Sequence, residues 1–323
     1  MEATMIPDEK AAPEVTQEPA QMPKPRKKLY GEHYLAIFAG FLALVVLALT
    51  IFCLPYITAE EPEDDPMELI QNGGRETIPP VPTIAEPDPD TGEKLPEPEK
   101  NPYGKLDFQY EGRYLGCLKA ETIPGVDVSY YQGNIDWKQV KESGIEFAII
   151  RIGYRGYGKE GKMAEDKMAY QNLKGALNAG LKVGVYFFSQ ATTVEEALEE
   201  ADFVLKRIKD YDITMPVVFD WEYISEEART AHVDARTLTD CYLAFCGKIR
   251  EAGYTPMAYF NTYQSRQLMY LTELEEYPFW LALYSSRMTF PYRIEMWQYT
   301  PYGRVPGIQG EVDINLMFTD EYF

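Results

Sequence analysis

The chain has 323 residues but only two histidines and four cysteines. A Ser-His-Asp triad and a histidine-rich zinc site both need an imidazole in the pocket. His33 lies beside an apolar run and His232 stands alone, so both kinds of site are disfavoured. The cysteines are Cys53, Cys117, Cys241 and Cys246, and none has metal-ligand spacing. We therefore read them as small apolar residues and expect no metal and no cofactor.

Basic residues are scarce as well, with 31 Lys and Arg against 51 Asp and Glu and a formal net charge of −20. Without a basic patch to neutralise phosphates, nucleic acid is not expected as a partner. The acidic excess is uneven, because residues 58–102 hold 13 Asp and Glu but only three Lys and Arg. Hydrophobic residues make up 46% of the chain, which is ordinary for a globular protein.

Charge is absent from one long stretch, residues 34–54, where 21 consecutive residues carry none. About 20 apolar residues suffice for a helix to cross a bilayer. The preceding residues 1–33 read as a disordered tail with a basic cluster, and acids follow the run, so the positive-inside rule predicts a cytoplasmic N-terminus. A signal peptide cleaved after Ala59 is the alternative, but the run is long for one. A lipidated Cys53 is disfavoured by the bulky Phe52 before it.

The segment that follows, residues 55–119, is predicted to be an extracytoplasmic linker. Ten prolines fall within residues 58–102. Proline fixes φ and like charges repel, so this composition favours a stiff, extended spacer. Residues 103–119 have an ambiguous pattern and are treated as the approach to a domain that spans residues 120–323.

From residue 120 onward, strand-like and helix-like patterns alternate. Strands are expected near residues 123–129, 147–152, 182–188, 215–222, 255–260, 279–284, 293–299 and 311–318, and helices near 137–142, 164–179, 193–209 and 235–252. Glycine follows three of these helices, at Gly144, Gly180 and Gly253, as expected for left-handed helix ends. We predict an irregular β/α barrel of about eight strands and four to five helices. An open doubly wound sheet is the alternative, weakened by the lack of a glycine-rich phosphate loop.

Acidic residues occupy the ends of the expected strands. Asp220 and Glu222 are two residues apart in a strand, so their side chains share a face. Asp127 and Asp313 likewise alternate with Val and Ile in the first and last strands, which places them on the inward face. Sites in such barrels lie at the carboxyl ends of the strands. We therefore expect four carboxyl groups around one mouth, the equipment of glycoside hydrolysis.

Eight short motifs occur along the chain in an order that is typical of one known protein family. The set is Gly125-Val126-Asp127-Val128-Ser129, Gln132-Gly133, Ile135-Asp136-Trp137, Arg151-Ile152-Gly153-Tyr154, Gly184-Val185-Tyr186, Asp220-Trp221-Glu222, Trp297-Gln298-Tyr299 and Val312-Asp313-Ile314-Asn315. In this order they resemble glycoside hydrolase family 25, the Chalaropsis-type lysozymes, over residues 122–318. The resemblance implies cleavage of the β-1,4 bond between N-acetylmuramic acid and N-acetylglucosamine in peptidoglycan.

The resemblance also implies roles for the acids. Glu222 matches the general acid, and Asp220 matches the carboxylate that positions the substrate acetamido group or stabilises charge. Asp127 and Asp313 match acids that line the same pocket. Many relatives carry histidine where this chain has Phe187, so any contact of that histidine is in doubt here.

Aromatic residues near the strand ends are candidates for stacking on sugars, with ordinary core packing as the alternative for each. The predicted substrate-binding residues are Arg151, Tyr154, Tyr186, Tyr284, Trp297 and Tyr299. Asp220 needs hydrogen-bond donors to stay ionised, and Arg151 or tyrosine hydroxyls are the candidates.

These inferences combine into a membrane-anchored peptidoglycan hydrolase. Residues 34–54 would anchor it as a single-pass protein of the cell membrane, with the barrel on the outside, where its substrate lies. Two alternatives stay open: a non-catalytic wall-binding protein on the same barrel, and a hydrolase of another N-acetylated glycan such as chitin.

Overall fold

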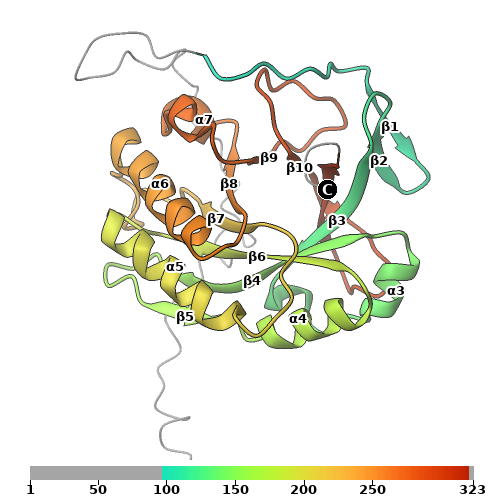
Figure 1. Ribbon diagram of the computed structural model, residues 1–323, viewed down its shortest axis with the longest axis horizontal. Helices are drawn as coiled ribbons and strands as arrows, with labels where there is room; N and C mark the ends of the chain where they lie inside the picture. The colour runs from blue at the N-terminus through green and yellow to red at the C-terminus, as the bar shows by residue number, and fades with distance from the viewer. Residues whose placement is uncertain (1–96, 320–323) are drawn as a thin grey trace, which may run out of the picture. The chain divides into compact units, whose positions relative to one another are not determined.

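The computed structural model describes residues 97–319, and these form a closed β/α barrel (Figure 1). The barrel strands are β3 (Thr122–Val128), β4 (Phe147–Arg155), β6 (Lys182–Ser189), β7 (Val217–Trp221), β8 (Pro256–Asn261), β9 (Phe279–Ala282), β10 (Met296–Gly303) and β11 (Val312–Phe318). The order around the barrel is β3-β11-β10-β9-β8-β7-β6-β4, and a β3–β4 pairing closes it. The predicted eight-stranded barrel is confirmed, and the open doubly wound sheet is excluded.

One strand runs against the others. The pairings from β3 through β4, β6, β7, β8 and β9 to β10 are all parallel, but β11 is antiparallel to both β10 and β3. The start of β11 therefore lies at the same end of the barrel as the carboxyl ends of the other strands. A short strand, β5 (Met163–Glu165), pairs with β4 outside the barrel, where the sequence predicted the first turn of a helix.

Helices cover the outside of the barrel along β4, β6, β7 and β8 (Figure 1). The helices of the described residues are α3 (Trp137–Glu142), α4 (Ala169–Asn178), α5 (Val194–Ile208), α6 (Ala235–Glu251) and α7 (Gln264–Gln267), with 3₁₀ turns η1 (Tyr130–Gln132) and η2 (Leu271–Leu274). Glycines 144, 180 and 253 follow α3, α4 and α6 with φ of 99°, 75° and 87°, as the sequence predicted. Thr193 caps α5 by accepting from the Glu196 N–H at 3.3 Å. The Glu196 carboxylate accepts from the Thr192 N–H at 2.8 Å, whereas a full capping box would have it accept from the N–H of the cap residue Thr193.

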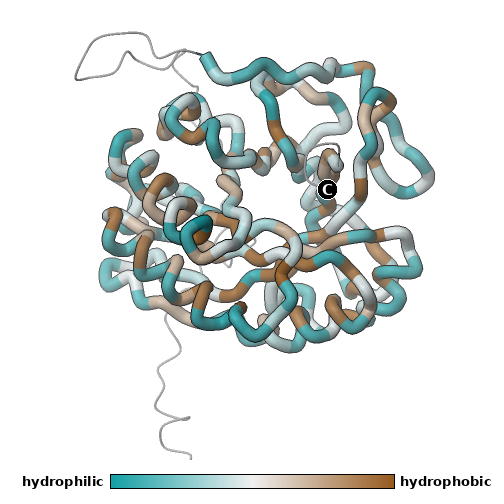
Figure 2. The backbone as a smooth tube through the Cα atoms, in the orientation of Figure 1, coloured by the Kyte–Doolittle hydropathy of each residue, from teal (hydrophilic) through white to brown (hydrophobic). Residues whose placement is uncertain are grey.

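Side-chain alternation sorts each strand into an outer and an inner face. On β7, Val217, Phe219 and Trp221 are buried against the helices, whereas Val218 belongs to the separate cluster inside the barrel. In Figure 2 the apolar colour concentrates along the strands, and the helices alternate between apolar and polar. The predicted alternation of apolar residues outward and acids inward is therefore confirmed for this strand.

The inside of the barrel is apolar at the amino ends of the parallel strands. The inner cluster there includes Ile123, Phe147, Met215, Val218, Met257, Met296 and Met317. Phe147 is fully buried, and its ring fills the space beside Gly125, where an added Cβ would lie only 2.2 Å from Cζ. A side chain at position 125 would displace this ring, so glycine is required at this close approach.

The folded unit starts earlier in the chain than the sequence predicted. Strands β1 (Phe108–Glu111) and β2 (Tyr114–Cys117) form a hairpin that packs on the outside of β10. The Phe108 ring meets the Trp297 ring edge to face at 5.1 Å, and the Arg293 N–H donates to the Glu99 carbonyl at 2.8 Å. The last part of the predicted linker, residues 97–119, is therefore part of the domain. Few helices pack on this side of the barrel, and the hairpin takes their place.

Within residues 97–319 no helix is long and apolar enough to cross a membrane. The predicted anchor at residues 34–54, the basic tail before it and linker residues 55–96 lie outside the described range.

Candidate active site

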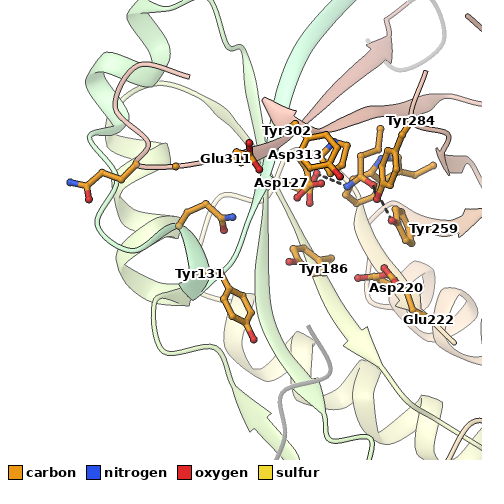
Figure 3. Close-up of a pocket in the computed structure, with 16 residues that line it drawn as sticks. Asp127, Tyr131, Tyr186, Asp220, Glu222, Tyr259, Tyr284, Tyr302, Glu311 and Asp313 are labelled. Atoms are coloured by element: carbon orange, nitrogen blue, oxygen red, sulfur yellow. Dashed lines mark hydrogen bonds between the residues drawn. The ribbon is translucent and has the colours of Figure 1, made fainter. Parts of the chain in front are cut away.

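The four predicted acids come together at one end of the barrel (Figure 3). Asp127 is next to last in β3, Asp220 is next to last in β7, and Glu222 directly follows β7. Asp313 is the second residue of β11 and pairs in register with Asp127. Its arrival at this mouth depends on the antiparallel direction of β11, because in a parallel strand a second residue would lie at the opposite end.

These acids line a cavity of about 490 Å³. The other lining residues are Tyr131, Gln132, Tyr186, Tyr259, Trp280, Tyr284, Gln298, Pro301, Tyr302, Gln309, Gly310 and Glu311. The lining thus combines five carboxyl groups with aromatic side chains and contains no Lys, Arg or His. Such a mixture suits a neutral, hydroxyl-rich ligand with apolar C–H faces better than an anionic one.

Asp127 is held by two amide groups of fixed orientation. The Gln298 and Asn315 side-chain amides donate to its Oδ1 at 2.9 and 2.7 Å. The Tyr259 hydroxyl donates to Gln298 Oε1 at 3.0 Å and the Trp280 indole to Asn315 Oδ1 at 2.9 Å. These donors fix each amide oxygen, so each NH₂ group faces the carboxylate. Burial raises the pKa of Asp127 to about 6, although both amide bonds oppose the rise.

Asp220 is buried, and its Oδ1 has no hydrogen-bond partner in the described structure. Burial first, and then the neighbouring charges of Glu222 and Asp127, raise its pKa well above the ordinary value. Arg151 or a tyrosine hydroxyl was predicted as the donor to this carboxylate. Arg151 forms a buried ion pair with Asp166 at 2.8 Å, and its charge favours ionised Asp220. A buried acceptor without a donor is costly and needs an explanation.

Glu222 is partly exposed at the cavity wall. Burial of the carboxyl group and the charge of Asp127 raise its pKa to about 7, and a hydrogen bond with Tyr259 opposes them. An acid with this pKa is about half protonated at neutral pH, which is the state that a general acid needs. Burial is the larger of the two causes that raise this pKa.

The predicted binding residues fall into three groups. Tyr186 and Tyr284 line the cavity. Arg151 and Tyr154 are buried beside each other, with the guanidinium 5.1 Å from the ring centroid, and do not line it. Both are packed inside the barrel, and their predicted role in substrate binding stays a prediction.

Trp297 and Tyr299 lie on the opposite face of β10, which corrects the prediction that they bind substrate. Both are buried in the outer core, and the Leu115 N–H donates to the Tyr299 hydroxyl at 3.3 Å. The residue between them, Gln298, points inward to Asp127. Alternation along this strand could have found Gln298, since it assigns residues 297 and 299 to the other face.

Several cavity residues have no such local signal. Tyr131, Tyr302 and Glu311 reach the cavity from the η1 turn, from β10 and from the segment before β11 (Figure 3). Their position depends on how these segments fold over the barrel mouth, which spacing in the sequence does not reveal.

The chain is similar to known proteins over most of the barrel. The family model "Glycosyl hydrolases family 25" matches residues 126–308. Lysozyme M1 of Streptomyces globisporus is 28% identical over 226 residues, which cover 63% of this chain and 70% of that protein. The autolytic lysozyme of Clostridium acetobutylicum is 28% identical over 195 residues, which cover 60% of this chain and 55% of that protein.

A solved structure is similar as well. The modular autolysin LytC from Streptococcus pneumoniae, in complex with a synthetic peptidoglycan ligand, superposes with a TM-score of 0.54 at 26% identity. The match covers 61% of this chain but 47% of LytC, so this chain spans about half the length of that protein. The family match takes in more than half of the chain and three of the four predicted acids. The chain therefore belongs to glycosyl hydrolase family 25 and is a glycoside hydrolase.

Proposed function

We propose that this protein hydrolyses peptidoglycan at the β-1,4 bond between N-acetylmuramic acid and N-acetylglucosamine. The observation that carries the proposal is the pair Asp220 and Glu222 at the end of β7, in an acidic and aromatic cavity of a family 25 member. Its relatives named lysozyme and autolysin support the choice of substrate.

Glu222 is the general acid in this proposal. Its raised pKa of about 7 leaves a proton available at neutral pH. That proton passes to the glycosidic oxygen as the bond between this oxygen and the anomeric carbon breaks. The resulting carboxylate then takes a proton from the water that completes hydrolysis, which restores the starting state.

Asp220 orients the substrate acetamido group. Its buried Oδ1 lacks a donor, and an acetamido N–H supplies one. This hydrogen bond favours the ionised form of Asp220. When Asp220 and Glu222 hold one proton between them, that proton therefore stays on Glu222. The acetamido oxygen, held in place, attacks the anomeric carbon as the leaving oxygen departs, and water then opens the cyclic intermediate.

Tyrosines at the cavity mouth hold the glycan. Tyr284 and Tyr302 line the cavity and remain 55% and 54% exposed. Large exposed aromatic rings at a cavity suit stacking on the apolar faces of sugars. Tyr284 was predicted from the sequence to bind substrate, and we assign the same role to Tyr302, in place of Trp297 and Tyr299.

Product analysis on purified cell walls tests the activity. We expect loss of turbidity and muropeptides with reducing N-acetylmuramic acid ends, both abolished by Glu222→Gln. Wall binding without new reducing ends would instead identify a wall-binding protein. Cleavage of chitin but not of peptidoglycan would identify another glycan as substrate.

We also propose that residues 34–54 anchor the enzyme in the cell membrane with the barrel outside. The charge-free run and its basic N-terminal flank support this topology. The full chain should stay in the membrane fraction after an alkaline wash, and external protease should remove the barrel from intact protoplasts. A mature N-terminus at residue 60 would show cleavage after Ala59 and contradict the anchor.

A further inference from the structure

The proposed general acid lies just beyond a strand end. The β6–β7 ladder stops at the pair Ser189 and Trp221, and Glu222 is the next residue. The ladder therefore does not fix the backbone of Glu222 on its β6 side. A small rotation of this residue would move the carboxyl group relative to a bound glycosidic oxygen.

The side chain of Gln190, the residue after β6, continues the pairing. It is fully buried, and its Nε2 donates to the Glu222 carbonyl at 2.7 Å and to the Ser189 carbonyl at 2.9 Å. Both amide hydrogens are thus used on backbone carbonyls, one of which belongs to Glu222. On this side the Glu222 backbone is held by a side chain in place of a strand.

A hydroxyl group sets the orientation of the Gln190 amide. Thr230, which is 1% exposed, donates from Oγ1 to Gln190 Oε1 at 3.1 Å. If the amide were rotated by half a turn, its oxygen would face two carbonyl oxygens and its NH₂ would face the hydroxyl. The Thr230 bond therefore favours the orientation in which the amide NH₂ reaches Glu222.

Thr230 is itself tied to the outside of the barrel. The neighbouring Arg229 donates from Nη2 to Glu196 of α5 at 2.5 Å, and its backbone N–H donates to the Tyr157 carbonyl at 3.0 Å. Glu196 also lies 3.7 Å from the Arg155 guanidinium. The segment that follows Glu222 is thus anchored to α5 and to the segment after β4, and Thr230 transmits this anchorage to Gln190.

We propose that Gln190 is a positioning residue for Glu222, and that Thr230 holds the Gln190 amide in the working orientation. The inference rests on the proposed role of Glu222 as the general acid. It concerns kcat rather than substrate affinity, because neither Gln190 nor Thr230 lines the cavity. A misplacement of about 1 Å at the reacting groups costs on the order of 100-fold in rate.

Thr230→Val tests the inference with Thr239→Val as a matched control. Both threonines are buried. The Thr239 hydroxyl also donates to a carbonyl, that of Ala235 at 2.7 Å, and it accepts from the Tyr270 N–H at 3.0 Å, away from the cavity. We expect Thr230→Val to lower kcat about tenfold with KM unchanged. This is less than the roughly 100-fold loss expected for a displacement of about 1 Å, because the Gln190 amide itself remains. Thr239→Val should leave kcat unchanged, although its loss of thermal stability should be at least as large, because two hydrogen bonds are removed. Gln190→Met, which removes both donors, should lower kcat further.

The ionisation of Glu222 provides a readout that does not depend on turnover. In Thr230→Val the carboxyl group gains freedom to hydrate, so NMR titration of Glu222 should show a pKa below that of the unchanged chain, and the alkaline limb of the rate profile should move to lower pH. Unchanged titration and kcat in both Thr230→Val and Gln190→Met would overturn the inference, as would equal losses of kcat in Thr230→Val and Thr239→Val. Failure of the proposed function is distinct: the unchanged chain would then release no reducing ends.

Discussion

The two ends of the barrel interior use the same inward positions for opposite purposes. Along β3 the inward residues run from Ile123 to Asp127, and along the antiparallel β11 they run from Met317 to Asp313. At the amino ends of the parallel strands the interior is filled by methionine and aromatic side chains. At their carboxyl ends it forms an open cavity lined by acids. Two to four residues along a strand thus separate a stabilising core from a reactive cavity. This comparison predicts that substitutions at one end change stability and those at the other change activity.

The largest expected effect comes from Glu222→Gln at the open end. Removing the proton donor should reduce kcat by about 10³-fold or more, because general acid catalysis contributes about 10²–10⁴-fold. The free energy of unfolding should not fall, since the variant has no buried charge at this position. Muropeptide release measures the first quantity and denaturant unfolding the second. The control is Glu226→Gln, an exposed acid on the segment that follows, which should retain activity.

Phe147→Ala probes the closed end. The fully buried ring fills the space beside Gly125, so its loss leaves a cavity and should reduce the free energy of unfolding by about 3–5 kcal/mol. The pH dependence of kcat should stay the same in the fraction that folds. A shift of the pH profile in this variant would show that the two ends are coupled and would break the comparison.

The pH dependence of the free energy of unfolding should show how much stability is lost when the acids of the cavity ionise. The pKa values of Glu222 and Asp127 rise in the folded state to about 7 and about 6, so the native state holds these protons more tightly than the unfolded chain. Stability from these groups is therefore present at low pH and is lost as pH rises from about 4 to about 7, by up to about 3 kcal/mol for Glu222. Glu222→Gln should flatten this part of the curve. An identical slope in the variant would contradict the assignment.

The smallest expected effects separate the two faces of β10. Tyr302→Ala should raise KM about fivefold, because stacking of one ring contributes about 1 kcal/mol. Tyr299→Phe should leave KM unchanged and reduce stability by about 1 kcal/mol through loss of the bond from Leu115. Steady-state kinetics and thermal unfolding of both variants distinguish them. A higher KM in Tyr299→Phe would restore the binding role first assigned to it.

The sequence by itself determined the eight barrel strands, the glycine helix ends and the shared face of Asp220 and Glu222. Each of these depends on residues close together in the chain, and alternation or a left-handed turn is a local property.

Only the tertiary structure decided which other side chains reach the cavity and which acids are ionised there. The antiparallel direction of β11 brings Asp313 beside Asp127, and the β1–β2 hairpin makes Trp297 and Tyr299 part of the outer core. Burial of Glu222 and the pairing of Arg151 with Asp166 set which groups are ionised. These outcomes depend on which distant segments meet. Desolvation and packing arise from contacts between these distant segments, so no single stretch of the chain encodes them.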